Sequence, residues 1–188
     1  MNKSPYYYTD QLYSARLTTR FLTAQDIEPW SEFYKSPDAI QFLHVSTWFP
    51  DDPAPEPLRL SDFMISRQLR RYAEQRYGLQ VILEKERGTF LGLCGLVTQE
   101  VDGQRELEVG YHFFRQHWGK GYATEAARLF LDFAATHKLS ESVVSLINPA
   151  NVASRRVAER NGLTVDKFTR WPEHQEVVVY RTTSFKHN

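Results

Sequence analysis

Residues 108–126 read Glu-Val-Gly-Tyr-His-Phe-Phe-Arg-Gln-His-Trp-Gly-Lys-Gly-Tyr-Ala-Thr-Glu-Ala, and they decide the fold that this sequence predicts. The β-branched and aromatic residues of 106–114 predict a strand. Gly119 and Gly121 then predict a tight turn, and the apolar pattern that follows, at helical spacing, predicts a helix over 122–138. The first N–H groups of a helix have no intrahelical acceptor and lie at the positive end of its dipole. A strand, a turn and a helix in this order therefore predict an anion site.

Three phosphate-binding loops compete for this turn. The Walker A loop is excluded because Lys120 is followed by Gly121 and not by Ser or Thr. A dinucleotide-binding loop would need Gly or Ala at Thr124 and an acidic residue after the next strand, where Asn148 stands. The pattern Q/R-x-x-G-x-G/A, in contrast, is matched at every fixed position by residues 116–121. The third loop is therefore the best interpretation of the turn.

The segments on either side of the turn alternate between strand and helix patterns. A capping box, Thr23-Ala24-Gln25-Asp26, begins the first helix, and a proline-rich loop at 49–57 separates it from a helix at 58–77. Four side chains of that second helix are expected to face solvent, namely Arg67, Arg70, Arg71 and Arg76. Strands are expected at 15–23, 79–86, 89–100, 106–114, 142–147, 163–170 and 176–185, and further helices at 122–138 and 151–161. This order predicts a single mixed α/β (α+β) domain.

The composition excludes other classes of protein. The chain has 188 residues, 41% of them apolar, and its 23 basic residues balance its 23 acidic ones. This size is enough for one domain with a buried core, and without net positive charge no DNA partner is expected. The sequence shows no secretory signal pattern and no apolar run of membrane-spanning length, so no membrane partner is expected. The one cysteine, Cys94, lies in an apolar strand as a packed thiol, which favours the cytoplasm, and no spacing of histidines indicates a metal site.

Two linked motifs resemble a known family. The loop extended through Trp118–Ala126 and the later segment Asn148–Gly162 are similar to those of the GNAT acetyl-CoA-dependent N-acetyltransferases. They resemble in particular the RimJ/RimL-like subgroup, which acetylates the N-termini of ribosomal proteins. The segment Ala15–Asp26 is similar to the first strand and helix entry of that subgroup, so the resemblance covers about residues 15–185. It implies an N-terminal extension at 1–14 and a GNAT domain at 15–188, with a mostly antiparallel sheet of about seven strands flanked by helices.

The resemblance implies that the turn holds the diphosphate of coenzyme A, with acetyl-CoA as cosubstrate. A backbone N–H of the preceding strand would stabilise the developing oxyanion. Trp118 is expected to anchor the loop, and Asn151 either contacts the pantetheine amides or only caps its helix. The residues expected to bind the cosubstrate are Val109, Gly110, Tyr111, Arg115, Gln116, His117, Trp118, Gly119, Lys120, Gly121, Tyr122, Ala123, Asn151 and Ser154.

The catalytic groups are less well defined by the sequence. Many GNAT enzymes protonate the departing thiolate with a tyrosine, and at that position this sequence has Ala158. Ser154 matches a serine of the RimL-like segment that is thought to contact the coenzyme sulfur, so the resemblance implies that it donates to the thiolate. A base must also take a proton from the amine. Strand alternation places Glu106, Glu108 and His112 on one face and does not select among these three.

The resemblance implies transfer of acetyl to a primary amine by direct attack in a ternary complex. The acceptor is either a protein N-terminus, such as that of a ribosomal protein, or a small amine such as a polyamine, aminoglycoside or amino acid. It is expected between residues 44–57 and 170–174, with Trp48, Phe49 and Trp171 as walls. The acidic residues there, Asp51, Asp52, Glu56 and Glu173, either attract a cationic amine or are simply solvated. A non-catalytic acyl-CoA sensor and a nucleotide-binding protein are the alternative functions, and a homodimer is the alternative to a monomer.

Overall fold

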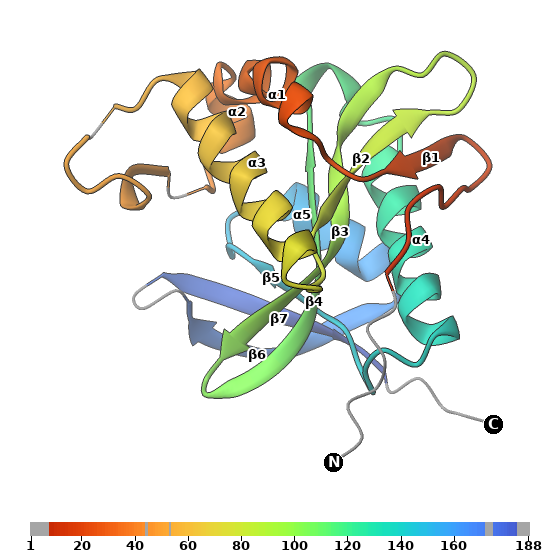
Figure 1. Cartoon of the computed structure of the whole chain (residues 1–188). Coiled ribbons are helices and arrows are strands. Elements are labelled where there is room, and N and C mark those ends of the chain that lie inside the picture. The colour runs from red at the N-terminus through yellow and green to blue at the C-terminus, as the bar shows by residue number, and fades with distance from the viewer. Residues whose placement is uncertain (1–7, 44, 53, 172–174, 184–188) are drawn as a thin grey trace.

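The computed structural model describes residues 8–43, 45–52, 54–171 and 175–183. Its centre is a seven-stranded sheet in the order β1-β2-β3-β4-β5-β7-β6 (Figure 1). Neighbouring strands are antiparallel except β4 and β5, which are parallel. The strands are β1 (Leu17–Arg20), β2 (Leu79–Glu84), β3 (Phe90–Val101), β4 (Gln104–Phe113), β5 (Val144–Ile147), β6 (Leu163–Arg170) and β7 (Glu176–Thr182). This confirms the predicted fold class.

Helices cover both faces of the sheet (Figure 1). One face carries α1 (Ile27–Tyr34), α2 (Pro37–Ile40) and α3 (Pro57–Ala73), and its core contains Trp30 and Ile65, both without exposed surface. The other face carries α4 (Tyr122–Thr136) and α5 (Val152–Arg160), and its core is built around Phe130. Alternate residues of each central strand therefore point into two separate hydrophobic layers. None of the helices in the described ranges is long and apolar enough to cross a membrane.

The helix α4 packs closely against the sheet because its inner face is small. Ala126, Ala127 and Ala134 are at most 1% exposed, and Phe130 is fully buried between them and the strands. Burial of a phenylalanine side chain of this kind contributes about 1.5–3 kcal/mol. The apolar stripe predicted for 122–138 is confirmed, and it fixes the position of the turn that precedes the helix.

Several elements differ in length from the sequence prediction. The first strand ends at Arg20 because the Arg20 guanidinium donates to both oxygens of Asp26 (2.9 and 2.7 Å), and the Thr23 N–H donates to the same carboxylate (2.8 Å). These contacts turn the chain into the predicted capping box, which is present. The helix predicted over 58–77 ends at Ala73, close to Gln75 with φ of 52°. The predicted start of the first helix is a 3-10 turn, Ala24–Asp26, that leads into α1. The short helix α2 and the 3-10 helices Val45–Thr47 and Arg115–His117 were not predicted.

The solvent-facing prediction for the arginines of α3 is wrong for two of them. Arg71 is only 6% exposed and Arg67 is half-buried. Helix α3 lies against β3 on its inner side, and the stems of both side chains are long enough to lie along that interface. Arg70 and Arg76 are exposed as expected.

Candidate active site

Strands β4 and β5 diverge in the middle of the sheet. Among the described residues they share one residue pair, Glu108 with Val144. Beyond it the Ser145 hydroxyl donates to the Val109 carbonyl (3.3 Å), and the Leu146 N–H donates to the Glu108 carboxylate (3.3 Å). Side chains therefore replace the regular ladder, and the edge of β4 past Glu108 faces an opening in the sheet.

The glycine turn lies at the β4 end of this opening. Gly119 and Gly121 have φ of 76° and 80°, in the left-handed region that favours glycine. A Cβ added at Gly119 would meet no atom within 4 Å, so open space lies in front of the turn. The first backbone hydrogen bond of α4 runs from the Glu125 N–H to the Gly121 carbonyl (3.1 Å). In the described part of the chain, the N–H groups of residues 119–124 donate to no protein acceptor. Free N–H groups at the start of a helix are an arrangement that can bind phosphate groups, and we refer to them as the cradle.

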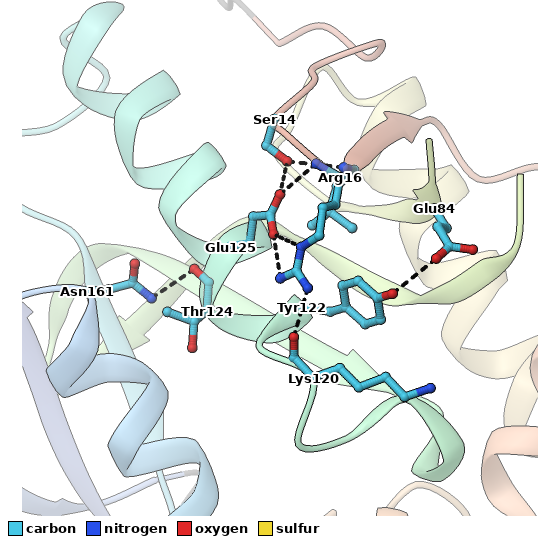
Figure 2. A network of polar contacts seen from close by, with 9 residues as sticks. Ser14, Arg16, Glu84, Lys120, Tyr122, Thr124, Glu125 and Asn161 are labelled. Carbon is cyan, nitrogen blue, oxygen red and sulfur yellow. Dashed lines mark hydrogen bonds and ion pairs between the residues drawn. The ribbon is translucent and has the colours of Figure 1, made fainter. Parts of the chain in front are cut away.

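Arg16, which directly precedes β1, forms an ion pair with Glu125 that holds the turn, and Figure 2 shows it. The Arg16 guanidinium donates to Glu125 Oε2 (2.7 Å) and to the Lys120 carbonyl (2.9 Å), and it lies over the Tyr122 ring at 4.6 Å. Glu125 also accepts from the Ser14 hydroxyl (2.7 Å) and the Arg16 N–H (2.9 Å). Burial alone would raise the pKa of Glu125, but these donors lower it. The sequence analysis did not predict this ion pair, although Arg16 and Glu125 both lie inside the segments that carry the family resemblance.

The predicted side chains of the turn have structural partners. The Trp118 indole N–H donates to the Phe113 carbonyl (2.7 Å), which fastens the turn to the end of β4 as expected for an anchor. Arg115 stacks over Trp118 at 4.9 Å and pairs with Asp38 (3.0 Å). Gln116 and Lys120 are exposed, and partial burial lowers the pKa of His117. The backbone of the turn is therefore better placed for an anion than these side chains, apart from Lys120.

The start of α5 faces the same opening from the far side. The Asn151 side chain accepts from the Ser154 N–H (3.0 Å), so it caps the helix. The Ser154 hydroxyl donates to the Tyr111 hydroxyl (3.1 Å), which in turn donates to the Ser154 carbonyl (3.0 Å). Burial raises the pKa of Tyr111 to about 12, so both hydroxyls keep their protons at neutral pH. This pair joins β4 to α5. Arg155, one residue further along α5, donates to the Tyr180 hydroxyl (3.0 Å).

Glu108 is the buried carboxylate of the site. It is 8% exposed and accepts from Gln99 Nε2 (3.0 Å) as well as from the Leu146 N–H. Burial raises the pKa of the Glu108 carboxyl to about 7, against the opposing effects of these two donors and of Arg71 and Arg67. A carboxyl group with such a pKa is half-ionised at neutral pH, which suits a general base.

The other two candidates on this face are occupied or neutral. Glu106 forms a two-point contact with the Arg181 guanidinium (3.0 and 2.7 Å). His112 lies against Phe33 with ring centroids 6.0 Å apart, and burial lowers its pKa to about 4. Strand alternation put all three on one face, and the tertiary contacts separate them.

A cleft of about 710 Å³ lies on the α3 face of the sheet. It runs between α3 and the end of β3 and is bounded by Phe49. Of the other predicted acceptor walls, Trp48 packs on Phe63 with centroids 5.2 Å apart, and Trp171 donates to the carbonyl of Glu100 at the rim (2.8 Å). His44 and Glu173 lie outside the described residues. Asp52 is paired with Arg59, so it is not free to attract an amine.

The lone thiol and the histidines give no second site. Cys94 is fully buried, and burial raises its pKa above the ordinary value. Within the described ranges, no group of three or more His, Cys, Asp or Glu side chains is arranged to hold a metal ion.

A sequence model of the acetyltransferase (GNAT) domain matches residues 16–164. The match spans most of the chain, and it includes both the glycine turn and the α5 segment. The chain therefore belongs to the GNAT acetyltransferase family, whose members use acetyl-CoA. The family and enzyme class predicted from the two motifs are confirmed.

Three similar proteins illustrate the relationship. The uncharacterized protein YkkB of Bacillus subtilis is 41% identical over 115 residues, which cover 60% of this chain and 66% of the relative. A crystal structure of an acetyltransferase from Agrobacterium tumefaciens superposes with a TM-score of 0.75 at 26% identity and covers 98% of this chain and 100% of its own. A structure of RimL, a ribosomal L7/L12 alpha-N-protein acetyltransferase in complex with coenzyme A, gives a TM-score of 0.72 at 14% identity, covering 93% and 97%. The last likeness shows the fold alone.

Proposed function

We propose that this protein is an N-acetyltransferase that acts on a primary amine by direct attack in a ternary complex. The single observation that carries the proposal is the position of Glu108, a buried carboxylate at the point where β4 and β5 diverge. The opening that follows it runs to the unpaired N–H groups of residues 119–124. A base and an anion cradle thus lie on one strand and the turn that follows it.

Each group of the chain has a distinct task in this proposal. The N–H groups of the turn hold the diphosphate, and the unpaired edge at Val109–Tyr111 offers a backbone donor to the developing oxyanion. When bound, acetyl-CoA supplies an activated acetyl thioester. Glu108 accepts a proton from the ammonium form of the acceptor, directly or through a water, and the freed nitrogen forms the new C–N bond as the C–S bond breaks.

When acetyl-CoA is bound, the Ser154 hydroxyl turns its one proton from Tyr111 to the departing sulfur, and the Tyr111 hydroxyl donates to Ser154 Oγ in place of the Ser154 carbonyl. The sulfur takes up the second proton released by the nitrogen. Tyr111 comes from β4, whereas the tyrosine that many family members use would stand at position 158. The Ser154 and Tyr111 pair thereby supplies hydroxyl groups at a site where Ala158 has none. Glu106 is excluded as the base in this scheme because Arg181 engages both of its oxygens.

The acceptor that we propose is a protein N-terminal amine. The support is the similarity of residues 118–126 and 148–162 to the RimJ/RimL-like subgroup. We place this activity in the cytoplasm, on the ground that the one thiol is buried and unpaired.

A thiol-release assay with acetyl-CoA tests the proposal. N-terminal peptides, polyamines, amino acids and aminoglycosides are supplied one at a time, and release that depends on the acceptor is expected. CoA binding, measured by the ligand-induced shift in melting temperature, is followed in parallel with ATP and NAD as controls. Binding of CoA without transfer to any acceptor would favour an acyl-CoA sensor, and stabilisation by ATP or NAD alone would contradict the assignment.

A further inference from the structure

The cleft beside α3 has an unusual charge. Its wall carries five arginines against three carboxylates, although the whole chain has no net charge. The arginines are Arg59, Arg67, Arg70, Arg71 and Arg76, and the acids are Asp62, Glu74 and Glu100. The cleft therefore presents positive charge to whatever enters it.

Two of these arginines already have carboxylate partners. Arg59 pairs with Asp52 and lies over the Phe49 ring at 4.1 Å, and Arg76 pairs with Glu74 (3.1 Å). These two cations are neutralised locally and contribute little to the attraction of a distant charge.

Arg67 and Arg71 are different because they are withdrawn from solvent and form no ion pair with a carboxylate of the described residues. Arg71 is 6% exposed, and the one hydrogen bond from its guanidinium to a described residue is a long contact of 3.4 Å to the Tyr77 carbonyl. Arg67 is half-buried, and its guanidinium forms neither a hydrogen bond nor an ion pair with another described residue. A guanidinium has five N–H donors, and leaving them unmatched in a buried place is costly. Burial accordingly lowers the pKa of Arg71 to about 10 and also lowers that of Arg67.

One residue connects this cleft to the proposed base. Gln99 lines the cleft, and its side-chain amide donates to Glu108 (3.0 Å). Burial has the larger effect on the pKa of Glu108 and raises it, and the charges of Arg71 and Arg67 act in the opposite direction. An acceptor that came to Glu108 along this cleft would pass the two arginines.

We propose that Arg67 and Arg71 bind an anionic group of the acceptor and thereby place its amine beside Glu108. The inference rests on the proposed function and names its acceptor class: primary amines that also carry a carboxylate or a phosphate. Guanidinium groups hold both anions through paired N–H donors. The anion comes either from a small molecule or from an acidic side chain next to a peptide N-terminus, and these two sources share one chemistry.

Matched acceptors test the inference by kcat/KM for thiol release. The small-molecule pairs are O-phosphoethanolamine against ethanolamine, and β-alanine against β-alaninamide. The peptide pair differs only by Glu or Gln at the second residue. We expect kcat/KM to be about tenfold or more higher for the anionic member in the small-molecule pairs, in the peptide pair or in both. The pair that shows the preference identifies which kind of molecule carries the anion. The preference should fall as the salt concentration rises. Equal or lower activity with the anionic member in all pairs would overturn the inference.

Variants link the preference to the two side chains. Arg67→Gln should bring the ratio of kcat/KM for the anionic and neutral acceptors close to 1, mainly by raising KM for the anionic one. Arg67→Glu should reverse the preference, so that the cationic or neutral acceptor is favoured. Arg71→Gln should also reduce the preference for the anionic acceptor. If this buried variant fails to fold, the variants at the half-buried position 67 still test the inference. Arg87→Gln, in the exposed β2–β3 turn, is the matched removal of a charge and should change nothing. A preference that survives in both Arg67 variants would overturn the inference.

The experiments distinguish a failure of the proposed transferase activity from a failure of the proposed acceptor class. If no acceptor supports thiol release, the proposed transferase activity is wrong. If neutral and cationic amines are acetylated as well as anionic ones, the transferase activity stands and only the acceptor class is wrong.

Discussion

The carboxylate of Glu108 accepts a hydrogen bond from the backbone N–H of Leu146 at 3.3 Å, so a side chain of β4 takes the place of a backbone acceptor for β5. This contact lies just past the one residue pair shared by the two strands, Glu108 with Val144. The contact between the Leu146 N–H and the Glu108 carboxylate therefore both ends the pairing of the strands and holds the proposed base in place. Strand divergence and the position of the base are one structural feature of this sheet.

Replacement of Glu108 by Gln should remove the base while keeping the shape of the side chain and one of the two oxygens that accept from Leu146 and Gln99. The expected loss in kcat is about 10²–10⁴-fold. Steady-state kinetics at saturating acetyl-CoA measure it. Glu106→Gln, which breaks an ion pair on the same face, should retain most of the activity, and the reverse order of effects would contradict the assignment.

The pH dependence should report the same group. Because burial raises the pKa of Glu108 to about 7, the base is protonated below that pH and ionised above it. The plot of kcat/KM should rise by about tenfold per pH unit below 7 and bend near it. The amine of the acceptor also titrates, so the comparison is between wild type and Glu108→Gln at each pH. A bend of unchanged size in the variant would assign it to the acceptor.

Ser154→Ala and Tyr111→Phe should each lower kcat by about 10-fold to 100-fold, because each removes a hydroxyl from one hydrogen-bonded pair. The double variant should cost little more than either single one, since both groups act as a unit. Affinity for CoA, measured by calorimetry, should change little. Full additivity in the double variant would show that the two hydroxyls act independently.

Gly119→Val should abolish most CoA binding. The residue adopts φ of 76°, and the space that a side chain would enter is open, as expected for a position that faces a ligand. We expect a rise in Kd of at least about tenfold. Gly88→Val is the control, because Gly88 has φ of 67° and equally open surroundings but lies in the β2–β3 turn. It imposes the same backbone strain away from the site, so equal losses of CoA binding would indicate a general effect on folding.

Glu125→Gln should loosen the glycine turn and lower stability by about 1–2 kcal/mol, after allowance for the partial exposure of the pair. Equilibrium denaturation gives the stability, and the KM for acetyl-CoA should rise. The pKa of Glu125 is lower in the folded state than its ordinary value of 4.5. Its contribution is therefore complete above about pH 4.5 and is lost as the pH falls below it, so wild type and variant should converge in acid. A constant difference down to pH 3 would contradict this account.

The elements of the fold were predictable where local patterns are strong. Residues 163–170 form β6 with the predicted bounds, and the helix at 122–138 has its predicted inner face. The conformation of the turn was predictable from its glycines, because a left-handed backbone strongly favours glycine. The short helix α2 has only four residues and no pattern long enough to be recognised.

The sequence by itself determined the family, the strand–turn–helix order of the proposed coenzyme cradle, and the set of three residues from which the proposed base was selected. Those features depend on residues close together in the chain. Only the tertiary structure decided that Glu108 is buried while Glu106 is engaged by Arg181, that Tyr111 meets Ser154, and that Arg67 and Arg71 line a cleft. Each of these depends on contacts between segments far apart in the chain. Burial and charge at such contacts set the pKa and the partners of a side chain, and no local pattern contains them.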